Sequence, residues 1–117
     1  MGLILWIDAN TFATSLLDKV FKTQGGAFYS LGSVDDFSYI VEDLKPVAIV
    51  LDYSTFKKNA DRFYQQLESS ELMKVTPFIL LDDPEKELKL NNIIGYLKRP
   101  FDPFEIPAEI QKIISTQ

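Results

Sequence analysis

Three short apolar runs without polar alternation constrain the fold of this chain most strongly. They cover residues 3–7, 47–51 and 78–81, and weaker runs lie at 27–31 and 96–98. A strand that is apolar on both sides of its pleat needs cover on both faces of its sheet, which is typical of parallel sheets flanked by helices. The sequence therefore predicts a buried parallel sheet, with the run at 96–98 as its shortest strand.

Amphipathic segments separate these runs, with apolar residues spaced three and four positions apart. The first segment follows a predicted Asn10 cap. The second follows a predicted Ser33 cap and ends before Pro46. A third lies around Phe63, and the last follows a capping box at residues 102–105. Each segment is predicted to be a helix.

The alternation of strands and helices predicts a single α/β domain over residues 1–117. With right-handed crossovers, five βα units form a doubly wound parallel sheet, for which we expect the flavodoxin-like strand order 2-1-3-4-5. Residues 83–90 leave room for only a short or irregular fourth helix. Pro107 is expected to distort the start of the last helix.

Composition excludes several kinds of chemistry. The chain has 117 residues with no Cys and no His, which removes thiolate nucleophiles, Ser-His-Asp triads and zinc sites built on Cys or His. A formal net charge of -5 argues against nucleic acid as a partner. No apolar stretch reaches the length of a signal peptide or a membrane span, so we expect a cytoplasmic protein without a membrane partner.

Charged residues follow the strands at one edge of the predicted sheet. Asp8 follows the first run and Asp52 the third. Asp82 follows the fourth run, and Arg99-Pro100 follows the fifth. Because open parallel sheets place their chemistry at the carboxyl ends of the strands, this edge is the candidate site.

The pattern resembles the CheY-like receiver domain of response regulators over essentially the whole chain. The resemblance implies that Asp52 stands at the position of the phosphorylated aspartate and Asp8 at an acid of the magnesium site. Arg99 stands where the family has Lys, and Pro100 is a candidate cis-proline. Tyr96 takes the position of the aromatic switch residue.

Substitutions at this site depart from the family pattern. Ala9 replaces the usual main magnesium ligand, so a metal site made by Asp8 and Asp52 should be weak. Asp82 replaces the hydroxyl of the switch position and adds a negative charge. Because a guanidinium is suited to pairing with carboxylates, we expect Arg99 to bridge Asp52 and Asp82.

These departures favour a stand-alone degenerate receiver, or pseudo-receiver, in two-component-type signalling. It would bind a histidine kinase, regulator or scaffold independently of phosphorylation, as a monomer or weak homodimer. It would need no cofactor, with Mg²⁺ only weakly bound, and would not be an enzyme. The first alternative is a working receiver, phosphorylated on Asp52 by a histidine kinase, with residual phosphoryl transfer. The second is a flavodoxin-like domain that binds a small ligand, although no glycine-rich phosphate loop accompanies it.

Overall fold

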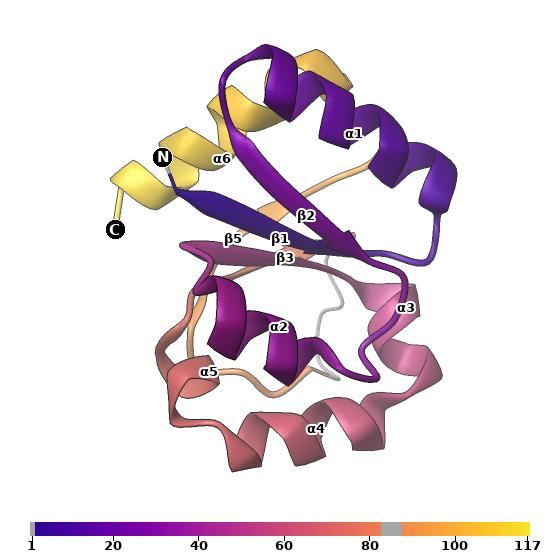
Figure 1. Ribbon diagram of the computed structural model, residues 1–117, viewed down its shortest axis with the longest axis vertical. Coiled ribbons are helices and arrows are strands. Elements are labelled where there is room, and N and C mark those ends of the chain that lie inside the picture. The colour runs from indigo at the N-terminus through magenta and orange to yellow at the C-terminus, as the bar shows by residue number, and fades with distance from the viewer. Residues whose placement is uncertain (1, 83–87) are drawn as a thin grey trace.

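The structure is a computed structural model that describes residues 2–82 and 88–117. In this part of the chain, a parallel sheet of five strands has the order β2-β1-β3-β4-β5 (Figure 1). The strands are β1 (Leu3–Ile7), β2 (Ala27–Leu31), β3 (Ala48–Asp52), β4 (Phe78–Leu81) and β5 (Ile93–Leu97). The predicted doubly wound, flavodoxin-like fold is therefore confirmed.

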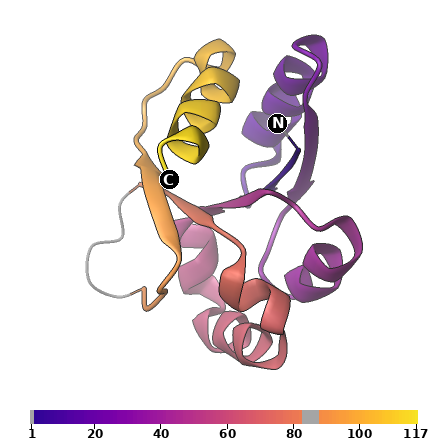
Figure 2. The ribbon, with the colours of Figure 1, turned by 90° about the vertical axis from the view of Figure 1, so that its left-hand side faces the viewer.

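Helices cover both faces of this sheet, as the edge-on view in Figure 2 shows. One face carries α1 (Thr11–Thr23) and α6 (Ile106–Ser115), which follows the short 3-10 helix η1 (Pro103–Glu105). The other face carries α2 (Phe37–Leu44), α3 (Tyr53–Lys58), α4 (Ala60–Ser69) and α5 (Glu71–Val75).

Alternate strand residues enter two hydrophobic cores, one on each face of the sheet. On β1, Ile4 and Trp6 pack into the core beneath α1 and α6, whereas Leu5 and Ile7 pack into the other core. All residues of β3 and β4 are buried. This burial on both faces explains why the apolar runs of the sequence lack polar alternation.

The start of α2 differs from the sequence prediction. The Ser33 hydroxyl accepts a hydrogen bond from the N–H of Asp35 and closes a turn, and the helix begins only at Phe37. The Gln66 side chain oxygen, from α4, accepts the N–H of Ser38 at 2.9 Å. The predicted Ser33 cap is therefore wrong, because a distant helix satisfies the first turn of α2.

The ends of several elements also shift. The third strand begins at Ala48 and includes Asp52. The fifth strand ends at Leu97 and has five residues, so the four-residue β4 is shorter than it. Pro107 lies in the first turn of α6, directly after η1, which agrees with the predicted irregular start.

Two short helices, α3 and α5, are not predicted by the sequence, because six and five residues are too few to show a helical period. The predicted brief fourth helix falls mainly on residues 83–87, which lie outside the described residues, and residues 88–92 contain no helix. Among the helices that the structure describes, none is long and apolar enough to cross a membrane.

Candidate functional site

Three aspartates meet around Arg99 at the carboxyl edge of the sheet. Nη2 of Arg99 lies 2.9 Å from Oδ2 of Asp8, which follows β1. Nη1 lies 3.0 Å from Oδ1 of Asp52, the last residue of β3, and also contacts Oδ2 of Asp82, which follows β4. The predicted bridge from Asp52 to Asp82 is therefore present, and it extends to Asp8.

Asp52 is buried, and both of its carboxylate oxygens are bonded within the chain. Oδ1 accepts a hydrogen bond from Arg99. Oδ2 accepts three more, from the N–H of Thr55 at 3.1 Å, the Thr55 hydroxyl at 2.8 Å and the Ser54 hydroxyl at 3.2 Å. A carboxylate has about four lone-pair sites, two on each oxygen, so the donors at Oδ2 fill that oxygen, while Oδ1 is held by Arg99. Asp52 also acts as the N-cap of α3.

Thr55 connects the loops that follow two neighbouring strands. Its buried hydroxyl donates to Asp52 and accepts the backbone N–H of Ala9 at 2.9 Å. Ala9 thus contributes only its backbone to the site, and its methyl group offers no metal ligand. Sequence analysis missed Thr55, although a hydroxyl three residues after Asp52 was the available signal.

Asp8 is buried beneath the guanidinium. Its Oδ2 also accepts the indole N–H of Trp6 at 3.4 Å, and its Oδ1 accepts the N–H of Asn10 at 3.0 Å. Burial raises the pKa of Asp8, and the nearby Asp52 carboxylate raises it further. The hydrogen bonds from Asn10 and Trp6 and the charge of Arg99 oppose this rise without cancelling it.

Arg99 supplies the positive charge at the centre of the site. Partial burial lowers the pKa of Arg99, but hydrogen bonds and charge interactions with Asp52 and Asp82 outweigh it, so the pKa is raised overall. The guanidinium therefore stays protonated. Its two terminal nitrogens point at different carboxylates, which uses the planar fork that a Lys ammonium lacks.

Asp82 lies at the rim of the site, with its side chain 43% exposed. Its φ of 64° is in the left-handed region, which Asp tolerates better than most residues. Oδ1 accepts the backbone N–H of Arg99 at 3.3 Å, while Oδ2 contacts the guanidinium. Water screens this rim pair more than the two buried pairs.

Pro100 and Tyr96 are the remaining predicted site residues. The Arg99–Pro100 peptide bond is cis, as the resemblance implied. Tyr96 is half-exposed on β5 and lines a separate depression with Lys98 and Phe101. Tyr96 thus does not line the cavity that contains Asp8, Asp52 and Arg99.

The acidic pocket is an open cavity of about 380 Å³. Its lining residues are Asp8, Ala9, Asn10, Asp52, Ser54, Thr55, Lys58 and Arg99. Within residues 2–82 and 88–117, no group of three or more His, Cys, Asp or Glu side chains is arranged to hold a metal ion. Mg²⁺ needs several oxygen ligands, but here the Asp8 and Asp52 oxygens already accept protein donors. The donor set in this arrangement does not fit that ion.

Solved structures of receiver domains share this fold. A response regulator from Desulfuromonas acetoxidans superposes with a TM-score of 0.79 at 15% identity, covering 99% of this chain and 98% of that chain. A CheY-like receiver domain protein from Methanospirillum hungatei JF-1 gives 0.76 at 12% identity, with 99% and 98% covered. Vibrio cholerae CheY4 gives 0.74 at 15% identity, with 97% and 98% covered. No protein-family model and no curated protein matches the sequence.

Proposed function

We propose that this chain, which has the fold of response-regulator receiver domains, is a degenerate receiver that acts as a phosphorylation-independent interaction module. The receiver fold supports a role in two-component-type signalling, with a histidine kinase, regulator or scaffold as partner. The observation that carries the proposal is the bonding of Asp52, whose two oxygens both accept hydrogen bonds within the chain, Oδ1 from Arg99 and Oδ2 from Ser54 and Thr55.

Phosphoryl transfer to Asp52 would require an accessible carboxylate oxygen and a divalent cation that neutralises the developing charge. Oδ1 of Asp52 faces the guanidinium of Arg99, and Oδ2 caps α3. Asp82 adds a negative charge at the rim, which repels an approaching phosphate. The site therefore hinders nucleophilic attack by Asp52, and it also hinders the approach of a phosphoryl donor.

Arg99 provides within the chain the neutralising charge that a cation would otherwise bring. It connects the ends of β1, β3 and β4 through Asp8, Asp52 and Asp82. These contacts hold the acidic pocket in one arrangement. Partner binding would then depend on a constant outer surface and not on a change of state at Asp52.

Intact-mass measurement after incubation with acetyl phosphate and Mg²⁺ tests this proposal. We expect no phosphoryl adduct on the wild-type chain. Because the Trp6 indole donates to Asp8, Trp6 fluorescence reports on this carboxylate. We expect it to stay unchanged on addition of Mg²⁺, since Arg99 continues to hold Asp8.

The matched control restores the family's residues by combining Ala9→Asp, Asp82→Thr and Arg99→Lys. This variant is expected to gain an adduct, which the further change Asp52→Asn removes. An adduct on the wild-type chain that disappears in Asp52→Asn alone would contradict the proposal and support the working-receiver alternative.

A further inference from the structure

Large apolar side chains are exposed together on α1 and η1. Phe12 is 84% exposed, and Leu16 lies one turn further along the same side of α1. Phe104, from η1, is 67% exposed and lines the same groove as Leu16. A contiguous apolar patch of this kind indicates an interaction surface.

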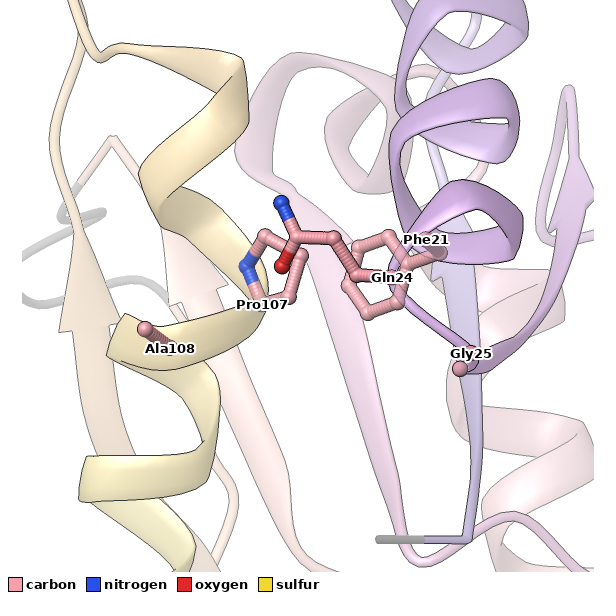
Figure 3. Close-up of a pocket in the computed structure, with 6 residues that line it drawn as sticks. Phe21, Gln24, Gly25, Pro107 and Ala108 are labelled. Atoms are coloured by element: carbon pink, nitrogen blue, oxygen red, sulfur yellow. The ribbon is translucent and has the colours of Figure 1, made fainter.

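A groove of about 210 Å³ lies beside this patch, between α1 and η1. Its lining residues are Leu16, Lys19, Val20, Thr23, Gln24 and Phe104. The Gln24 side chain holds η1 in place by donating a hydrogen bond to the carbonyl oxygen of Phe104 at 3.0 Å. Figure 3, a close-up of the neighbouring pocket, shows this side chain between the end of α1 and Pro107 of α6. The groove is thus already formed in the single chain.

Four residues of the groove have the spacing of a hole in knobs-into-holes packing. Leu16, Lys19, Val20 and Thr23 stand at positions i, i+3, i+4 and i+7 of α1. Such a hole accepts one side chain from a facing helix. The groove therefore fits a large apolar knob presented by a second helix.

Phe12 has the position that this hole requires in a second copy of the chain. In an antiparallel pair of α1 helices with a two-fold axis at Leu16, residue 12 of each copy faces residue 20 of the other. Phe12 of each copy then enters the hole of the other, of which Val20 forms one side. The two Leu16 side chains meet at the axis.

The charges of α1 are compatible with this register. Lys19 is the charged residue of the hole, and it faces Ala13 of the second copy, which is uncharged. Asp18 and Lys22 pair with each other within one chain at 3.0 Å. Like charges are therefore not brought together across the axis, which would otherwise oppose association.

We propose that this face is a homodimer interface, in which two copies of the chain pack through antiparallel α1 helices and exchange Phe12 knobs. One helix pair buries less than the roughly 800 Å² per partner of a standard interface, so the dimer is weak and depends on protein concentration. The inference does not rest on the chemistry of Asp52.

Disulfide cross-linking tests the position of the axis, because the chain has no Cys of its own. Leu16→Cys is expected to form an intermolecular disulfide under mild oxidation, since the two-fold axis brings residue 16 of one copy next to residue 16 of the other. Thr23→Cys is the matched control on the same helix. Its two copies would be about 20 Å apart at ~1.5 Å per residue, beyond the ~7 Å that a disulfide spans between Cα atoms.

Sedimentation velocity over about a hundredfold range of concentration tests the association itself. Wild type is expected to shift toward the dimer as concentration rises. Phe12→Ala is expected to raise the dissociation constant by about a hundredfold, because the knob is lost twice in a two-fold dimer. Tyr39→Ala, which removes a 76% exposed aromatic ring from α2, is the control and should have no effect.

A wild-type chain that stays monomeric throughout this range overturns the proposal. Equal cross-linking of the Leu16→Cys and Thr23→Cys variants also overturns it, because it indicates random collision. A monomeric chain that needs Phe12 to bind a helical signalling protein assigns the face to that protein, and overturns the homodimer as well.

Discussion

Asp52 and Asp82 end neighbouring strands and contact the same guanidinium, yet their environments are opposite. Asp52 is buried and accepts three hydrogen bonds besides the one from Arg99. Asp82 has a side chain that is 43% exposed, and both of its oxygens turn to Arg99. The Arg99–Asp52 and Arg99–Asp82 ion pairs, which the sequence does not distinguish, should therefore contribute unequally to the stability of the fold.

Solvent is the physical reason for this difference. When an exposed ion pair forms, its charges give up favourable contacts with water, so the pair contributes little to the stability of the fold. Removing one partner of a buried pair leaves an uncompensated charge and costs much more. The contacts of Arg99 with Asp52 and Asp8 should therefore stabilise the fold far more than its contact with Asp82.

The largest effect is expected for Arg99→Ala. This change leaves Asp8 and Asp52 buried without their cation, and we expect the free energy of unfolding to fall by about 3 kcal/mol. The value is at the low end for a buried pair because the Arg99 side chain is 35% exposed. Urea denaturation measures it. Arg99→Lys keeps the charge without the planar guanidinium, so its loss of unfolding free energy should be smaller. Equal losses for Arg99→Ala and Arg99→Lys would show that a positive charge without the guanidinium geometry does not stabilise the two buried carboxylates.

A smaller loss is expected for Thr55→Val, which keeps the volume of the side chain. It removes the buried hydroxyl that bonds both Asp52 and the N–H of Ala9, and we expect a loss of about 2 kcal/mol in urea denaturation. Ser54→Ala is the matched control, since it removes an exposed hydroxyl that donates a hydrogen bond to the same Asp52 oxygen, Oδ2. A loss for Ser54→Ala as large as that for Thr55→Val would refute the importance of burial.

The raised pKa of Asp8 predicts a pH-dependent difference between wild type and Asp8→Asn. Because the folded state binds this proton more tightly than the unfolded state, Asp8 stabilises the fold fully below its ordinary pKa of 3.8. This contribution disappears as the pH rises through the higher native pKa. The unfolding free energy of wild type relative to Asp8→Asn should thus fall with rising pH, by at most about 1.4 kcal/mol per unit. A relative stability that rises with pH over this interval would mean that the pKa is lowered instead.

The smallest effect is expected for Asp82→Asn, which removes the charge and keeps a residue type that tolerates the φ of 64°. Screening by water limits the loss of unfolding free energy to about 0.5 kcal/mol in the same measurement. Asp82→Ala adds backbone strain at this φ and should lose more than Asp82→Gly, because Gly adopts the φ of 64° without strain. A loss for Asp82→Asn that approaches the loss for Arg99→Ala would remove the distinction between the buried and the rim carboxylates.

Local patterns in the sequence predict the frame of this site well. The apolar runs predict the sheet and the edge at which Asp8, Asp52 and Arg99 meet, because each strand ends close to where its run stops. The rule for right-handed crossovers led to the expected strand order, which the structure has. Local patterns fail where a partner is distant. The first turn of α2 depends on Gln66 of α4, 28 positions from Ser38. Thr55 was missed for another reason, because it lies close to Asp52 but in a helix too short to show a period.

Residue order alone thus specifies which charges arrive at the carboxyl edge, since a parallel sheet collects its strand ends there. How these charges are shared depends on distances of about 3 Å between segments far apart in the chain. Thr55 reaches Ala9 across 46 positions, and Arg99 reaches Asp8 across 91. Hydrogen-bond strength falls steeply over a fraction of an ångström. Packing of the complete fold is therefore what turns a row of aspartates into a satisfied, guanidinium-centred cluster.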